Sequence, residues 1–339
     1  MLIPEKRLEE IFKNLNGKKV AIIGDLMIDR YFWGTVTRIS PEAPVPVVEI
    51  DSESNRLGGA ANVANNIKSL GGIPMLLGLL GNDGSGKNFL DICTQQSLDT
   101  SGIISDDDRP TTVKTRVIAH NQHVVRIDRE SKSEANSSLQ QKLLQILESN
   151  ISSIDAIIIE DYNKGVVGKE IILGAVKISK KYDKIITIDP KFNNFFEYKN
   201  VTVFKPNRKE TEEALGIKLL NDQNLEYAGK KLVETLQAEH VIITRGEYGM
   251  AVFGQNGSFK NIQTTARSVL DVSGAGDTVI STLTMAMTSG ADILEAALMA
   301  NTAGGIVCGE VGIVPIDKDE LFQTLLEDMN HRPPRKTGK

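Results

Sequence analysis

Residues 271–278 read Asp271-Val272-Ser273-Gly274-Ala275-Gly276-Asp277-Thr278, and the apolar spacing after them predicts a helix that begins at Ala275. Two glycines flank an alanine at the start of this helix, so several backbone N–H groups are free to point at one spot. The positive end of the helix dipole lies behind them, which suits the spot to an anion, above all a phosphate group. The alternative is an ordinary helix start whose glycines serve only close packing.

Asp277 falls in the first turn of the predicted helix, beside the predicted anion. A carboxylate there would repel a phosphate group, but it is well placed to take a proton from a hydroxyl that attacks the phosphorus. The stretch therefore suggests phosphoryl transfer with Asp277 as the base. Because so short a motif also occurs by chance, the remainder of the chain has to decide.

The composition favours one large domain. The chain has 339 residues, of which 40% are hydrophobic and 24% charged, enough for one α/β domain with a small accessory part. Its formal net charge of −5 argues against a broad surface for nucleic acid or an anionic membrane. We interpret Cys93 and Cys308 as reduced thiols, and the histidines form no zinc-binding pattern. No leader peptide or apolar stretch of membrane-spanning length is recognisable, so we expect a cytoplasmic protein.

Strands and helices alternate through most of the chain. A helix over 5–15 precedes a buried strand over 19–24. Farther on, we predict helices over 136–150, 168–182 and 223–237, and strands over 155–159, 184–188, 201–204 and 240–243. Polar residues follow each strand, as Asp25 and Asp29 follow the first. In an open α/β sheet these strand ends share one edge, where ligands bind.

Some strands do not fit this alternation. Residues 31–37, 45–51, 111–119 and 123–128 read as exposed strand pairs. They predict a small separate sheet, inserted in two pieces at about 31–57 and 104–130, and such a flap beside a site is often a lid. We assign residues 1–330 to the main domain and the basic residues 331–339 to a flexible tail.

Residues 81–88 (GNDGSGKN) resemble a nucleotide-binding P-loop, since they match G-x-x-x-x-G-K between a predicted strand and a predicted helix. Asn88, however, stands where that motif needs Ser or Thr to hold magnesium. A P-loop nucleotide switch is therefore a weaker alternative, under which Lys87 would be required for nucleotide binding.

Three motifs, taken in order, resemble those of the ribokinase-like (PfkB) carbohydrate kinases. They are residues 58–62 (GGAAN), 81–86 (GNDGSG) and 271–278, and the similarity extends over about residues 10–328. The resemblance implies a ribokinase-like three-layer α/β sandwich with a mainly parallel central sheet and a small inserted β-sheet lid. It also implies that the turn at 81–86 is structural.

A second set of segments resembles the D-glycero-β-D-manno-heptose 7-phosphate kinases. These segments are 38–47 (RISPEAPVPV), 126–130 (RIDRE), 161–165 (DYNKG) and 189–191 (DPK). The resemblance implies ATP-dependent phosphorylation of the C1 hydroxyl, which yields the 1,7-bisphosphate for ADP-heptose and the lipopolysaccharide core. The sequence departs from the pattern at Ser273, where Thr is common, and at Glu160, where a small residue is frequent.

The resemblance also implies roles for single residues. Asp277 would be the base, and the backbone N–H groups of Gly274, Ala275, Gly276 and Asp277 would stabilise the transferred phosphoryl group. Asp29, Gly58, Gly59 and Asn62 would bind sugar hydroxyls, and the nucleotide side would comprise Asn207, Glu210, Thr244, Arg245, Gly246 and Asn301. Candidates for the sugar 7-phosphate are Arg116, Arg126, Lys164 and Lys191, each of which could instead form an ordinary salt bridge.

ATP and Mg²⁺ are the implied cofactors, with magnesium bound mainly by phosphates and water and without a protein metal site. The segment 308–312 matches only loosely a loop that helps to bind K⁺ in relatives, so a K⁺ requirement stays open. We expect a sugar phosphate as ligand, a homodimer clasped through the lids, and a nucleotidyltransferase on another protein, because the chain stops at Lys339. The alternatives are a kinase of the same fold for another sugar and a non-catalytic sugar-phosphate-binding regulator.

Overall fold

The computed structural model describes residues 3–120, 122–264 and 269–331, and most of its strands form one nine-stranded sheet. In spatial order the strands are β13 (Phe259–Ile262), β12 (Met250–Gly254), β11 (His240–Thr244), β10 (Val203–Phe204), β9 (Ile185–Asp189), β8 (Ala156–Glu160), β1 (Lys19–Gly24), β4 (Ile73–Gly81) and β5 (Ile103–Asp106). Neighbours from β11 to β5 pair in parallel, whereas β12 and β13 are antiparallel. The carboxyl ends of the parallel strands therefore share one edge.

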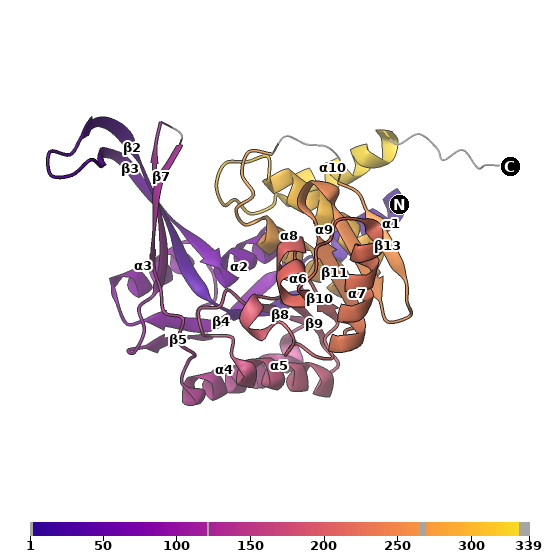
Figure 1. The fold of residues 1–339 in the computed structure, drawn as a ribbon. Coiled ribbons are helices and arrows are strands. Elements are labelled where there is room, and N and C mark those ends of the chain that lie inside the picture. The colour runs from indigo at the N-terminus through magenta and orange to yellow at the C-terminus, as the bar shows by residue number, and fades with distance from the viewer. Residues whose placement is uncertain (1–2, 121, 265–268, 332–339) are drawn as a thin grey trace.

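Helices cover both faces of this sheet (Figure 1). One layer contains α1 (Glu5–Asn14), α2 (Ala60–Ser69), α8 (Ala275–Thr288), α9 (Ile293–Val307) and α10 (Lys318–His331), and the other contains α4 (Ser137–Asn150), α5 (Lys169–Lys181) and α7 (Asp222–Leu236). Along β1, Val20 and Ile22 pack in the first layer, whereas Ala21 and Ile23 pack in the second. Burial on both faces explains why this strand is continuously apolar.

A second sheet of four strands forms the lid. Its strands are β3 (Pro46–Gly59), β2 (Leu26–Ile39), β6 (Thr112–Ala119) and β7 (Gln122–Arg129), in that order. β2 pairs in parallel with β6, whereas β2 with β3 and β6 with β7 pair antiparallel. The first residues of β2 are buried and its last ones are exposed, and the outer end of the lid projects from the body (Figure 1). The predicted architecture is confirmed.

The structure departs from the prediction most at the lid strands, at β5 and at α6. β2 begins at Leu26 and β3 ends at Gly59, so both lid strands reach deeper into the body than the predicted ranges. The short strand β5 was not predicted, and it pairs with β4, which places residues 104–106 in the central sheet rather than in the lid. Helix α6 (Arg208–Leu215) was also missed. Elements this short carry too few residues for a periodic signal.

Three smaller expectations concern the cysteines, the membrane and the tail. Cys93 and Cys308 are free thiols, as predicted. Within the described ranges, no helix is both long enough and apolar enough to cross a membrane. Of the predicted tail, residues 332–339 lie outside the described part of the chain.

Candidate active site

Three acidic side chains meet at the carboxyl edge of the central sheet. β8 ends at Glu160 and β9 ends at Asp189, and these two residues are neighbours in register. Asp277 joins them from the first turn of α8. Carboxylate oxygens of the three residues lie within 4.8 Å of one another, and all three side chains are buried. We call this group the carboxylate cluster.

The carboxylate of Asp277 accepts a hydrogen bond on each oxygen. Nδ2 of Asn62 donates to Oδ2 and the hydroxyl of Tyr162 donates to Oδ1, each at 2.7 Å. Burial raises the pKa of Asp277 to about 6, although the two hydrogen bonds lower it. A carboxyl group with this pKa is ionised at neutral pH and is basic enough to take a proton from a positioned hydroxyl.

The loop before α8 has the geometry of an anion site. Gly274 adopts a left-handed φ of 79° immediately before the helix, a conformation that favours glycine. Among the described residues, none accepts a hydrogen bond from the N–H groups of Gly274, Gly276 or Asp277. The N–H of Ala275 differs from the prediction, because it donates to the Val272 carbonyl at 3.3 Å. The other predicted donors are available to a phosphate group.

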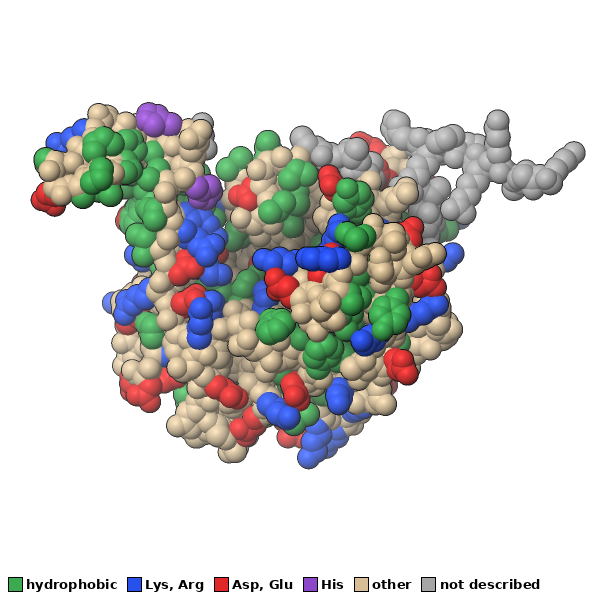
Figure 2. Space-filling view, viewed as in Figure 1, with side chains coloured by type: hydrophobic (Ala, Val, Ile, Leu, Met, Phe, Trp, Pro, Cys, Tyr) green, Lys and Arg blue, Asp and Glu red, His purple; other side chains and the backbone are tan. Residues whose placement is uncertain are grey.

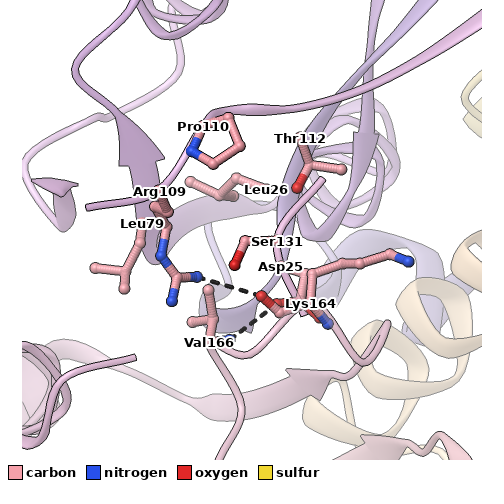
Figure 3. Close-up of a pocket in the computed structure, with 9 residues that line it drawn as sticks. All are labelled: Asp25, Leu26, Leu79, Arg109, Pro110, Thr112, Ser131, Lys164 and Val166. Carbon is pink, nitrogen blue, oxygen red and sulfur yellow. Dashed lines mark hydrogen bonds between the residues drawn. The ribbon is translucent and has the colours of Figure 1, made fainter. Parts of the chain in front are cut away.

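Asp25, directly after β1, holds the loop that carries Tyr162. Its carboxylate accepts the backbone N–H groups of Tyr162, Lys164 and Val166 at 2.8, 3.0 and 3.1 Å. Arg109 lies across a small pocket from this carboxylate and donates to the Lys164 carbonyl at 3.2 Å (Figure 3). Asp25 was an early site candidate, but its contacts make it a residue that positions Tyr162.

Glu160 is the least satisfied member of the carboxylate cluster. Its side chain is fully buried, and neither carboxylate oxygen has a hydrogen-bond partner within the described ranges. Burial, followed by the charges of Asp189 and Asp277, raises the pKa of Glu160 well above its ordinary range. Asp189, in contrast, pairs with the ammonium of Lys205 at 2.7 Å. Three carboxylate oxygens this close together could hold a cation, and the ammonium of Lys205 is the cation that Asp189 contacts.

The predicted sugar ligands lie where the lid joins the body. The buried carboxylate of Asp29, on β2, pairs with Arg116 of β6. A side chain at Gly58 would begin 2.1 Å from Oδ2 of Asp29, so only glycine leaves room for this carboxylate. Gly59 is the last residue of β3 and directly precedes α2, the helix from which Asn62 donates a hydrogen bond to Asp277. Asn62 therefore contacts the predicted base, and its buried Oδ1 has no partner in the described part of the chain.

Each of the four cations predicted for the sugar phosphate has a carboxylate partner. The pairs are Arg116 with Asp29, Arg126 with Asp128, Lys164 with Glu130 and Lys191 with Glu210. Arg116 and Arg126 are register partners on the lid, whereas Lys164 and Lys191 lie on loops after β8 and β9. Nζ of Lys191 also lies 5.2 Å from the centre of the Tyr162 ring, so Lys191 contacts both Glu210, predicted for the nucleotide side, and the residue that bonds to Asp277.

Sequence analysis missed two further cations, Arg56 and Lys114. Both are register partners of Asp29 and so lie on the same face of the lid. Nζ of Lys114 lies 4.9 Å from the centre of the Tyr162 ring, which brings this face to the predicted base. Basic side chains gather at the base of the lid, beside the hollow that separates the lid from the body (Figure 2). The alternation of Lys114 and Arg116 along β6 was the available signal.

Two of the predicted nucleotide residues lie at the N-terminus of α6. Asn207 and Glu210 form a capping box, in which each side chain accepts the backbone N–H of the other residue. Asn207 also forms an isolated β-bridge with Thr244, the last residue of β11. Three predicted residues are thus adjacent at the carboxyl ends of β10 and β11.

The remaining predicted nucleotide residues lie around Thr264. Its hydroxyl contacts the Gly246 carbonyl and Oδ1 of Asn301, each at 3.4 Å. The guanidinium of Arg245 donates to the Tyr248 carbonyl at 2.9 Å and to Oδ1 of Asn261 at 3.3 Å. The structure therefore brings Gly246 and Asn301 together through Thr264, whereas Arg245 contacts other residues.

The P-loop alternative fails at the N-terminus of α3 (Gly84–Gln95). Oδ1 of Asp83 accepts the Gly86 N–H at 2.8 Å, and Oδ2 accepts the Thr111 N–H at 3.2 Å. A carboxylate in this place uses the helix N–H groups and repels phosphate. The turn is structural, as the resemblance implied.

Comparison with known proteins agrees with this geometry. The pattern described as pfkB family carbohydrate kinase matches residues 17–318, which include both lid segments and the loop before α8. A protein named bifunctional protein HldE from Helicobacter pylori (strain HPAG1) is 42% identical over 304 residues, covering 90% of this chain. The HldE protein of Geobacter sulfurreducens is 39% identical over 320 residues, or 94% of this chain. This chain spans 65% of the length of each.

Solved structures show the same fold. Ribokinase of Arabidopsis thaliana, complexed with ribose and ATP, has a TM-score of 0.72 at 18% identity, with 91% of this chain and 99% of that chain covered. Phosphofructokinase-2 of Escherichia coli, in complex with potassium, has a TM-score of 0.74 at 16% identity, with 92% and 99% covered. The fold is the ribokinase-like α/β sandwich.

Proposed function

Because the chain belongs to the pfkB family of carbohydrate kinases, we propose that it phosphorylates the C1 hydroxyl of D-glycero-β-D-manno-heptose 7-phosphate, with ATP as the donor. The carbohydrate kinase class follows from the family, and the particular sugar is the proposal. It is supported by the similarity to the HldE proteins and by the segments at 38–47, 126–130, 161–165 and 189–191.

The observation that carries the proposal is the setting of Asp277. Its carboxylate is buried, has hydrogen bonds to both oxygens, and lies in the first turn of the helix whose N-terminal N–H groups at Gly274, Gly276 and Asp277 have no acceptor among the described residues. In the proposed reaction, Asp277 takes the proton of the sugar hydroxyl while the oxygen bonds to the γ-phosphorus. The bond from that phosphorus to the β–γ bridging oxygen breaks, and ADP leaves with the electron pair. The N–H groups of Gly274 and Gly276 would stabilise the transferred group.

Magnesium would offset the charge of the nucleotide phosphates. The phosphates and water molecules would be its ligands. Asn207, Thr244, Gly246 and Asn301 are the residues we propose for the nucleotide side. Activation by K⁺ stays a prediction. The loop after α9 does contact the loop before α8, since the N–H groups of Leu270 and Asp271 donate to the Cys308 carbonyl at 2.8 and 3.2 Å.

We assign the sugar 7-phosphate to the cationic face of the lid. Arg116 and Arg126 remain candidates, joined by Arg56 and Lys114. The guanidinium carbons of Arg56 and Arg116 lie 5.4 and 5.3 Å from the centre of the Tyr31 ring, so one aromatic ring contacts both groups. Arg116 is paired with Asp29, whereas Arg56 has no carboxylate partner in the described part of the chain. Bidentate arginines held in this way suit a phosphate dianion.

The assembly and the pathway are also proposals. Val125 and Ile127 of β7 are 48% and 56% exposed and alternate with Arg126, so an apolar face lies opposite the cationic one. We propose that two copies associate through their lids, which covers this face and the lid edges. The product would then pass to a nucleotidyltransferase.

The test is ATP consumption by the purified protein with the heptose 7-phosphate, fructose 1-phosphate, fructose 6-phosphate or ribose. We expect turnover with the heptose, a large loss in Asp277→Asn, and no change in the matched surface variant Lys87→Ala. Preference for another sugar would contradict the proposed substrate but would be consistent with the kinase activity. Folded wild type without turnover on any sugar would favour the non-catalytic regulator.

A further inference from the structure

A buried lysine that the proposed mechanism does not use lies beside the carboxylate cluster. Lys205 directly follows β10 and is only 2% exposed. Its Nζ lies 2.7 Å from Oδ2 of Asp189. Burying an ammonium is costly unless it is paired, and the pair with Asp189 offsets this cost. The pair does not explain why a lysine occupies this buried position.

The surroundings of Lys205 hold more negative charge than one ammonium neutralises. Glu160, Asp189 and Asp277 present oxygens within 4.8 Å of one another. The ammonium of Lys191 also acts on the cluster, but it is paired with Glu210 at 2.6 Å. Lys205 is therefore the lysine that bonds directly to the cluster, through Asp189.

The position of Gly276 relates this ammonium to the anion site. Gly276 is exposed at the first turn of α8. A Cβ built on it would lie 3.5 Å from Oδ2 of Asp189 and 3.9 Å from Nζ of Lys205. The ammonium is thus close to the first turn of α8. N–H groups at a helix N-terminus and an ammonium both attract an anion, so the two features can act on the same phosphate group.

We propose that Lys205 contacts the phosphoryl group during its transfer, as a cation built into the floor of the anion site. The inference rests on the proposed kinase reaction and adds a residue to it. An ammonium has three N–H donors, so Lys205 can keep its bond to Asp189 and give a second bond to a phosphoryl oxygen. It transfers no proton. Asp189 acts as a positioning residue that holds the ammonium in place before the substrates arrive.

The competing explanation is that Lys205 only neutralises Asp189. The two explanations separate in the variants Lys205→Met, Lys205→Arg, Asp189→Asn and Asp189→Asn/Lys205→Met, assayed with the heptose 7-phosphate and MgATP. We expect Lys205→Met to lower kcat by about 10²–10³, as loss of one oxyanion donor does, with a much smaller change in KM for ATP. Lys205→Arg should keep part of kcat, and Asp189→Asn should lose less than Lys205→Met.

The double variant removes the unpaired buried carboxylate, so it should be more stable to urea than Lys205→Met while its kcat stays low. Recovery of kcat together with stability would overturn the inference, as would a folded Lys205→Met enzyme with kcat close to wild type. An Asp189→Asn enzyme with a kcat as low as that of the double variant would assign the loss of kcat to Asp189. This result would also overturn the proposed role of Lys205. If wild type itself shows no turnover, the proposed function fails instead.

Discussion

The hydroxyl of Tyr162 donates to Oδ1 of Asp277 at 2.7 Å, which ties the loop after β8 to the first turn of α8. The backbone N–H of Tyr162 donates in turn to Asp25 at 2.8 Å. The strand end at Asp25, the Tyr162 loop and helix α8 therefore fix the orientation of one carboxylate. The hydroxyl also stabilises the ionised form of Asp277, because it donates a hydrogen bond to it.

Tyr162→Phe should raise the pKa of Asp277. A hydrogen bond to a charged group contributes about 1.5–3 kcal/mol, and 1.36 kcal/mol corresponds to one pKa unit, so we expect the acidic limb of the kcat profile to move up by about one to two pH units. The matched control is Tyr198→Phe, since the Tyr198 hydroxyl donates to Asp161 at 2.6 Å instead. An acidic limb that stays in place in Tyr162→Phe would contradict the assigned role.

The wild-type enzyme should lose kcat in acid. Asp277 must be ionised to accept the proton, and its pKa is about 6, so kcat should level off above pH 7 and fall about tenfold per pH unit well below 6. Burial also raises the pKa of Asp25 to about 6. The response to Tyr162→Phe identifies which of the two carboxyl groups is being titrated. A flat profile down to pH 5 would exclude Asp277 as the base.

Glu160→Gln should change how stability depends on pH. The pKa of Glu160 is raised by burial in the folded state, so the folded protein binds this proton more tightly than the unfolded chain does. The charge of this buried group thus costs no stability below its unfolded pKa of about 4.5. The free energy of unfolding declines as the pH rises above that value, until the pH passes the folded pKa. Urea unfolding at pH 5, 7 and 9 should show Glu160→Gln gaining on wild type with rising pH. A constant difference between the two proteins would argue that Glu160 does not titrate.

Lys114→Met should weaken sugar-phosphate binding. A lost hydrogen bond to a charged group costs about 1.5–3 kcal/mol, so KM for the heptose 7-phosphate should rise by about tenfold or more, with KM for ATP little changed. The exposed Lys87, on α3, supplies the matched control Lys87→Met. If the sugar KM were the same in both variants, the 7-phosphate would have to bind elsewhere.

Charges placed on the apolar face of the lid should prevent association. Light scattering at micromolar concentration should give a dimer for wild type and a monomer for Val125→Glu/Ile127→Glu, because two buried carboxylates without partners are strongly unfavourable. Leu220→Glu, at a site 77% exposed after α6, is the control and should stay dimeric. A monomeric wild type would rule out the clasped lids.

Sequence analysis succeeded where the signal is local. The alternation of strands and helices, the lid strands and the helix start at Ala275 are all present in the structure. It failed for β5 and α6, which are short, and for the N–H of Ala275, which a carbonyl of the preceding loop takes up. Tyr162 was visible within a motif, but nothing in the residue order linked it to Asp277.

The residue order of this chain was sufficient for the α/β alternation, the inserted lid and the position of Asp277 at a helix N-terminus, because periodicity, turn chemistry and helix caps act over a few neighbouring residues. The covering of the sheet on both faces was implied by the resemblance to the ribokinase-like kinases. The contacts of each charge came from tertiary structure alone. Asn62 meets Asp277 across 215 positions, and Lys205 meets Asp189 only because β9 and β10 pair in register. Burial and pairing between distant segments set which carboxyl groups are basic and which cations are already paired, and neither can be read from the order of residues.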